Sequence, residues 1–236
     1  MLEVRNISFA YRSKSVLRGV SFVASPGEIV SVVGGNGAGK TTLLRILATL
    51  LVPDAGLVLS DGIDAFARPL RYRRQLGYLP ENPAPYDDMS VKEYLSYRAT
   101  IKGEPAKRIR RRISEAAEMC RVTDVLRTSI RQLSNGMRKR VALADAILLR
   151  PRVLLLDDFL AGLDTEMRDA AGAVLSDAAA FSSVIVTGHE LSDLAKWTTR
   201  FLVLRDGVVA STVSAAGGDS AETEARVRAD LAGGRA

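Results

Sequence analysis

The residues best suited to chemistry form a glycine-rich segment at positions 34–41 with the pattern G-x-x-x-x-G-K-T. This pattern is the phosphate-binding loop of nucleotide-binding proteins. Glycines let backbone N–H groups approach a triphosphate, and a helix that begins near Gly39 adds the positive end of its dipole. We expect Lys40 to supply a charge for the β- and γ-phosphates and Thr41 to place its hydroxyl on Mg²⁺. The candidate nucleotide-binding residues here are Gly34, Asn36, Gly37, Ala38, Gly39, Lys40, Thr41 and Thr42.

A pair of carboxylates follows the apolar run at residues 153–156. A continuous apolar run is typical of a buried parallel strand, and this one ends in Asp157 and Asp158. In a protein with a phosphate loop, a carboxylate at the end of a neighbouring strand completes the Mg²⁺ site. We therefore expect Asp157 to bind Mg²⁺ and Asp158 to lie beside the γ-phosphate. Two solvated carboxylates at a strand end are the alternative, which the phosphate loop disfavours.

Strands and helices that position these residues are predicted along the whole chain. Ser90 and Glu93 form a capping box that opens a helical region extending to about residue 131. Prolines at three positions within residues 80–85 exclude a helix there. The predicted strands are 2–9, 16–23, 29–33, 57–60, 76–79, 153–156, 183–187, 201–204 and 208–211. The other predicted helices are 41–51, 137–149, 165–179 and 220–231.

Length and composition favour a compact intracellular protein. The chain has 236 residues, 47% of them hydrophobic, which suits one large domain or two small ones. No apolar run approaches the roughly 18 residues needed to cross a bilayer, and the first residues read as a strand rather than a signal peptide. The single cysteine, Cys120, cannot form an internal disulfide and fits a reducing compartment. We therefore expect a cytoplasmic location.

The formal charge of +6 raises the question of an anionic partner. Aromatic residues are scarce and do not alternate with the basic ones, so no base-stacking surface and no nucleic-acid partner are expected. The basic run at residues 107–112 is interpreted first as the solvated face of a helix and second as a membrane-side or partner contact.

The order of the motifs resembles that of the ATP-binding subunits of ABC transporters over nearly the whole chain, with some likeness to bacterial exporter-type subunits. The resemblance implies an α/β phosphate-loop NTPase core of ABC ATPase type, with an N-terminal antiparallel β region. A helical subdomain at about residues 86–131 would be inserted in an ATPase domain at 1–212. Residues 213–236 would form a C-terminal tail, with a short helix. ATP and Mg²⁺ would be the cofactors.

The same resemblance assigns roles to residues outside the phosphate loop. Tyr11 would stack on adenine, and His189, the single histidine, would contact the γ-phosphate. Ser134 and Gly136, in the signature-like segment 133–137, would meet the γ-phosphate of ATP held by a second subunit. Asp164 would line the junction between the subunits.

The chain departs from the family pattern at several of these positions. Asp158 stands where a glutamate normally polarises the attacking water, which predicts slow hydrolysis with intact binding. Glu81 stands where the family has Gln, and it could ligate Mg²⁺ or position water. In the signature-like segment, Asn135 replaces a glycine and could keep a left-handed loop shape, while Met137 replaces Gln. Residues 159–161 are Phe-Leu-Ala instead of Pro-Thr-Ser.

Each motif occurs once, so one chain cannot complete a site that is shared between subunits. A homodimer and a heterodimer with a related subunit both satisfy this requirement. The leading hypothesis is an ATPase subunit, peripheral on the inner face of the cell membrane, that drives a separate membrane permease. The pattern at residues 77–82 points weakly to export, and the substrate is left open. The alternative is an ATP-binding dimerisation module that acts as a slow switch or an inactive partner.

Overall fold

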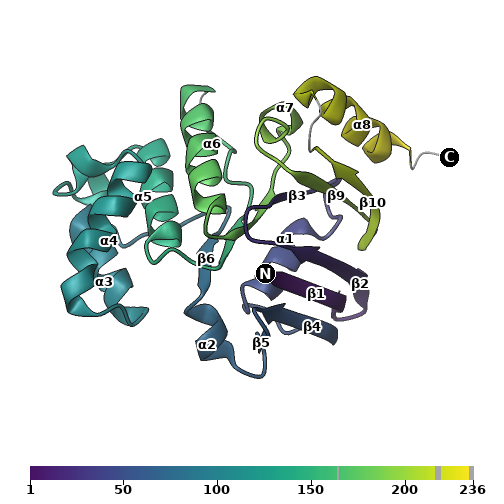
Figure 1. Ribbon diagram of the computed structural model, residues 1–236, viewed down its shortest axis with the longest axis horizontal. Coiled ribbons are helices and arrows are strands. Elements are labelled where there is room, and N and C mark those ends of the chain that lie inside the picture. The colour runs from purple at the N-terminus through teal and green to yellow at the C-terminus, as the bar shows by residue number, and fades with distance from the viewer. Residues whose placement is uncertain (164, 216–218, 234–236) are drawn as a thin grey trace.

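Two β-sheets and the helix between them form the body of the molecule, and three further helices gather at one end (Figure 1). The computed structural model describes residues 1–163, 165–215 and 219–233. The apolar face of α1 (Lys40–Leu47) packs in one core with both sheets. This arrangement places the phosphate loop, which precedes α1, between the sheets at one end of the core.

The first sheet is antiparallel and matches the β region that was expected at the N-terminus. Its strand order is β2-β1-β4-β5. The strands are β1 (Leu2–Tyr11), β2 (Lys14–Ala24), β4 (Ala55–Ser60) and β5 (Ile63–Asp64). The two-residue strand β5 was not predicted, because it is too short to show an alternating pattern.

The second sheet is parallel except for one edge strand. Its order is β10-β9-β3-β8-β7-β6, and only β10 runs antiparallel to its neighbour. The strands are β3 (Ile29–Val33), β6 (Leu76–Leu79), β7 (Val153–Leu156), β8 (Ser183–Thr187), β9 (Arg200–Arg205) and β10 (Val208–Ser214). Every residue of β3, β7 and β8 is buried, as their continuous apolar runs predict.

Three helices, α3 (Val91–Ile101), α4 (Ala106–Met119) and α5 (Asn135–Ile147), form the helical unit at one end of the molecule (Figure 1). The capping box at the start of α3 is confirmed, because the Ser90 N–H donates to Glu93 at 2.8 Å and the Glu93 N–H donates to Ser90 Oγ at 3.3 Å. Helical structure is not continuous to residue 131. Two 3₁₀ turns follow α4 instead, at Thr123–Val125 and Ile130–Gln132.

A buried carboxylate ties α3 to α5. Asp145 is 5% exposed and accepts hydrogen bonds from Arg98 Nε at 2.9 Å, Lys102 Nζ at 2.8 Å and Tyr94 Oη at 3.3 Å. Burial works against the charged form, but the cations of Lys102 and Arg98 outweigh it and hold the pKa of Asp145 below its usual value. These bonds fix the two helices against each other.

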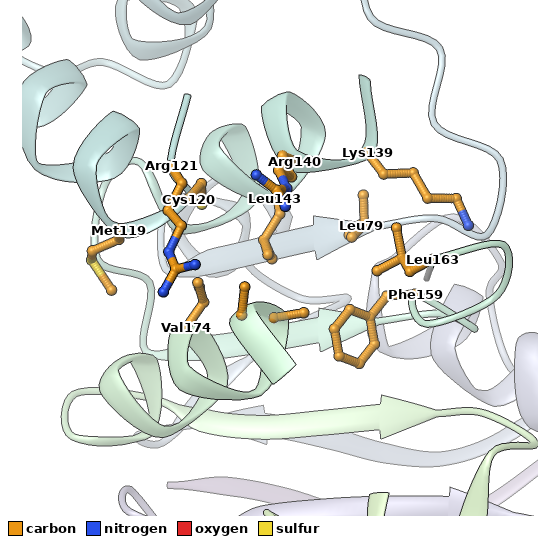
Figure 2. Close-up of a pocket in the computed structure, with 12 residues that line it drawn as sticks. Leu79, Met119, Cys120, Arg121, Lys139, Arg140, Leu143, Phe159, Leu163 and Val174 are labelled. Carbon is orange, nitrogen blue, oxygen red and sulfur yellow. The ribbon is translucent and has the colours of Figure 1, made fainter. Parts of the chain in front are cut away.

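The helical unit meets the core through side chains from several elements (Figure 2). Leu79, Leu143, Phe159 and Val174 line a cavity of about 20 Å³ there, which is room for about one water molecule. Phe159 and Leu160 are buried, so the apolar replacement at residues 159–161 contributes to packing. We regard the cavity as a packing gap.

The remaining helices complete the layers around the sheets. They are α2 (Pro69–Arg73), α6 (Thr165–Ala179), α7 (Leu191–Leu194) and α8 (Ser220–Ala232). Neither α2 nor α7 was predicted, because four or five residues are too few for a helical period.

The C-terminal segment is joined to the core. Strand β10 extends to Ser214, past the boundary expected after residue 212. Val227 of α8 is buried in the main core, and Ser211 Oγ bonds Asp230 Oδ2 at 2.6 Å. Within the described residues, no helix combines the length and the apolar character needed to cross a membrane.

Candidate functional site

The candidate site lies where the carboxyl ends of four neighbouring strands meet. Strands β3, β8, β7 and β6 are adjacent in the sheet, and ligands of open α/β sheets bind at the carboxyl ends of the strands. A pocket of about 420 Å³ opens there. It is lined by Tyr11, Lys14, Val16, Asn36, Gly37, Ala38, Gly39, Lys40, Thr41, Thr42, Glu81, Asp157, Asp158, Thr187 and His189.

The structure brings together most of the residues that the sequence indicated. Three candidates, Gly34, Ser134 and Gly136, do not line the pocket. Lys14, Val16 and Thr187 line it but were not foreseen from the sequence.

Thr187 had a signal in the sequence, because it ends a predicted strand two residues before His189. Lys14 had none, because its pairing with Tyr11 across the β1–β2 turn is seen only in the structure. Val16 lies two residues after Lys14, on the same strand β2.

The glycines of the loop serve packing as well as phosphate access. A Cβ on Gly34 would lie 2.3 Å from the carbonyl oxygen of Leu204, and a Cβ on Gly39 would lie 2.8 Å from Leu17 Cδ2. Gly39 also has φ 105°, which disfavours any side chain. A Cβ on Gly35 would have no atom within 4 Å. The backbone of Leu204 in strand β9 therefore leaves no room for a side chain at Gly34.

Lys40 begins α1 and lies folded over the loop. Its Nζ donates to the carbonyl oxygens of Gly34 at 2.8 Å and Gly35 at 3.2 Å. Burial lowers the pKa of the Lys40 ammonium, and the carboxylates of Asp158 and Asp157 oppose the shift. The first turn of a helix carries N–H groups without intrahelical partners, so this end of α1 is suited to an anion.

Asp157 is the buried centre of the site and is only 1% exposed. Its Oδ1 accepts hydrogen bonds from Thr187 Oγ1 at 2.7 Å and from Thr41 Oγ1 at 3.3 Å. Burial raises the pKa of Asp157, and the two hydroxyls only partly offset this effect. A buried carboxylate that is stabilised chiefly by neutral hydroxyls is suited to a cation.

The oxygen atoms of Thr41 and Asp157 fit Mg²⁺, which prefers hard oxygen ligands. Among the residues that the structure describes, no group of three or more His, Cys, Asp or Glu side chains could hold a metal ion. Proteins bind Mg²⁺ through one or two carboxylates together with substrate phosphates, and Asp157, with Thr41 bonded to it, supplies oxygens of that kind. The site therefore fits a metal that arrives with a nucleotide.

Asp158 combines a strained backbone with one carboxylate oxygen that has no hydrogen-bond partner among the described residues. Its φ is 45°, in the left-handed region, and its N–H donates to Thr187 Oγ1 at 3.0 Å. Its Oδ1 is buried and has no hydrogen-bond partner within the described part of the chain. Burial raises the pKa of Asp158, His189 opposes the shift, and the negative charges of Glu190 and Glu81 add to it.

The signature-like segment has a helical rather than a looped geometry. Ser134 caps α5 by accepting the Met137 N–H at 3.3 Å. Asn135 is the first residue of α5 and is not among the non-glycine residues with positive φ. The expectation that Asn135 preserves a left-handed loop is therefore wrong, because a helix start needs no such conformation. Asp164, expected at the subunit junction, lies outside the described residues.

Comparison with known proteins identifies the family. A family model described as "ABC transporter" matches residues 17–161. The chain belongs to this ABC transporter family. It is 35% identical over 221 residues to the sulfate/thiosulfate import ATP-binding protein of Methylococcus capsulatus, covering 91% of this chain and 63% of the relative. It is 32% identical to the spermidine/putrescine import ATP-binding protein of Spiroplasma citri, covering 89% and 60%. The chain thus spans less than two thirds of these relatives.

Solved structures confirm the predicted fold class. An ATP-binding subunit of an ABC transporter matches with a TM-score of 0.86 and 27% identity, covering 97% of this chain and 99% of the other. A dimeric bacterial ABC transporter cassette matches with a TM-score of 0.80 over 92% of this ABC-family chain and 100% of the other. Its 24% identity supports the fold alone.

Two neighbouring glycines provide a matched test of the loop. We expect Gly34→Ala to destabilise the fold by about 3 kcal/mol and to abolish nucleotide binding, because the methyl group would overlap Leu204. Gly35→Ala is the control, since its methyl group meets nothing within 4 Å. Thermal unfolding and titration with a fluorescent ATP analogue measure both effects. Equal behaviour of the two variants would contradict this account.

Proposed function

We propose that this chain is the ATP-binding and hydrolysing subunit of an ABC transporter and that it drives transport through a separate membrane permease. The observation that carries the proposal is the convergence of Lys40, Thr41 and Asp157 in one pocket at the carboxyl edge of the parallel sheet. Family membership supports it, and the named relatives are ATP-binding proteins. ATP would be the substrate and Mg²⁺ the cofactor.

Each lining residue has a role in this proposal. The N-terminus of α1 and Lys40 would hold the phosphates, while Thr41 and Asp157 would hold Mg²⁺, which supplies positive charge against the phosphate oxygens. Tyr11 is 43% exposed, and its ring packs edge-on against Phe9 with centroids 4.8 Å apart. This packing steadies the ring and leaves a surface on which adenine can stack.

Asp158 would polarise the attacking water, with Glu81 and His189 exposed at the rim of the pocket near the γ-phosphate. The carboxylate of Asp158 is one methylene shorter than that of the glutamate usual in this family. A displacement of about 1 Å costs on the order of a hundredfold in rate. We therefore propose slow hydrolysis on an intact binding site.

Lengthening this side chain tests the proposal. We expect Asp158→Glu to raise kcat by about tenfold or more, because it moves the carboxylate toward the reacting water. Asp158→Asn is the control, since it keeps the size and removes the base, and it should abolish turnover while ATP still binds. Steady-state phosphate release measures both variants. An Asp158→Glu protein with equal or lower kcat would overturn the proposal of slow hydrolysis.

The proposed working unit is a dimer, because the pocket lacks the signature-like residues. Ser134 and Gly136 stand at the start of α5 and do not line the pocket. In a two-fold arrangement, the signature-like segment of each copy would cover the nucleotide held by the other. A homodimer is the simpler form of the proposal, and a heterodimer with a related chain is the other.

Mixing two inactive variants tests the shared site. Lys40→Ala removes the phosphate charge, and Ser134→Arg blocks the surface that would meet the partner's nucleotide. A mixed homodimer contains one site with both defects and one site with neither. We therefore expect ATPase activity to return when the two variants are combined, although each is inactive alone. Continued inactivity of a verified mixed dimer would contradict a shared site.

The direction of transport and the location are further parts of the proposal. The pattern at residues 77–82 led to the prediction of export, whereas the two relatives named above are import proteins. A bacterial exporter with bound ATP also matches this fold, with a TM-score of 0.80 and 28% identity, over 95% of this chain and 41% of the exporter chain. We propose a position on the inner face of the cell membrane, against the permease. Export stays a prediction.

The alternative is a binding module with negligible turnover. The shortened side chain of Asp158, whose Oδ1 has no hydrogen-bond partner in the described part of the chain, favours it as the second candidate. Steady ATPase activity that Lys40→Ala abolishes would support the ATPase. Tight ATP binding without turnover, even beside the permease, would support the module.

A further inference from the structure

A single buried hydroxyl joins the two carboxylate residues of the site. Thr187 is the last residue of β8, and Leu156 of β7 pairs with Val186 of β8, so Asp157 and Thr187 emerge side by side from neighbouring strands. Thr187 Oγ1 donates to Asp157 Oδ1 at 2.7 Å and accepts the N–H of Asp158 at 3.0 Å. Because an N–H group only donates, the hydroxyl proton must point toward Asp157.

The bond from Asp158 to Thr187 supports an unusual backbone. A φ of 45° at a non-glycine residue persists only where the surrounding structure holds it. Two hydrogen bonds hold Asp158 here, one from its N–H to Thr187 Oγ1 and one from the Ala161 N–H to its carbonyl at 3.2 Å. The second bond lies within the same turn, so among the described residues the bond to Thr187 is the one that joins the Asp158 backbone to the neighbouring strand β8.

Gly188, which follows Thr187, gives the side chain of Asp158 no hydrogen bond comparable to the one that Thr187 gives its backbone. Gly188 has no side chain, and a Cβ there would lie 3.9 Å from Asp158 Oδ1 and 3.2 Å from Leu194 Cδ1. Asp158 Oδ1 itself has no hydrogen-bond partner in the described part of the chain. No hydrogen bond within the described residues fixes this oxygen, so the position of the Asp158 backbone, to which Thr187 is bonded, contributes to where it lies.

We propose that Thr187 is a positioning residue that holds Asp157 in place for the metal and Asp158 in place for the attacking water. The inference rests on the proposed ATPase function and adds a residue to it. Thr187 lines the pocket, but the role proposed for it is exerted through the two aspartates rather than by binding nucleotide or water. A buried threonine with a satisfied hydroxyl and no influence on the site is the competing explanation.

Three substitutions separate these explanations. Thr187→Val keeps the shape and removes the hydroxyl, and Thr187→Ser restores the hydroxyl. Thr198→Val is the matched control, because Thr198 is also buried and its Oγ1 bonds another side chain, Ser31 Oγ, at 2.6 Å. Neither Thr198 nor Ser31 lines the pocket.

The readouts include two that need no turnover. Mn²⁺ affinity, measured in the presence of a non-hydrolysable ATP analogue, reports the metal site. Hydrogen exchange at the Asp158 amide, measured on the nucleotide-free protein, reports the bond to Thr187. The third readout is the pair kcat and KM for ATP.

Loss of a partner that orients a metal ligand typically costs about 10- to 100-fold in metal affinity or activity. We expect Thr187→Val to lower kcat and Mn²⁺ affinity by about this factor and to speed exchange of the Asp158 amide, with a smaller change in KM. Binding of the analogue in EDTA should stay unchanged. Thr187→Ser should recover most of the loss, and Thr198→Val should behave as the wild type at the site.

Unchanged Mn²⁺ affinity and unchanged Asp158 exchange in Thr187→Val would overturn the inference. It would also be overturned if Thr187→Ser failed to rescue, or if Thr198→Val lost Mn²⁺ affinity equally. A wild-type protein that binds the analogue but does not hydrolyse ATP would defeat the proposed ATPase activity alone. The Mn²⁺ and exchange measurements would then still decide the role of Thr187.

Discussion

The burial of Asp157 at the end of β7 is the constraint on which the rest of the site depends. A carboxylate taken out of water must be compensated, and two threonine hydroxyls, from α1 and from β8, do so only in part. The remaining deficit is what makes the site suited to a divalent cation. The same two hydrogen bonds connect the phosphate loop to the centre of the sheet. The candidate nucleotide-binding and metal-binding residues are therefore both held by Asp157.

The order of the strands explains why these groups meet. β3, β8 and β7 are neighbours in the sheet although β8 follows β3 by some 150 residues of chain. Their carboxyl ends therefore deliver Lys40, Thr187 and Asp157 to one edge. The helical unit has its own polar network around Asp145, which fixes α3 against α5.

Much of the fold and of the site could be predicted because strand ends and glycine patterns are local signals. The apolar runs at residues 29–33, 153–156 and 183–187 predicted β3, β7 and β8, and the residues after them predicted the pocket. The contact between Gly34 and Leu204, and the hydroxyl link through Thr187, depend on long-range register that no local pattern carries. The prediction for Asn135 was wrong, because an asparagine tolerates positive φ but does not need to adopt it, and here its φ is not positive.

The claim that Asp157 completes a metal-dependent nucleotide site is tested most directly by measuring ATP affinity with Mg²⁺ and in EDTA. The account predicts that the wild-type protein binds ATP more tightly with Mg²⁺. It predicts that Asp157→Asn removes this difference and leaves the affinity in EDTA unchanged. A wild-type protein indifferent to Mg²⁺, or an Asp157→Asn protein that keeps the full difference, would contradict it.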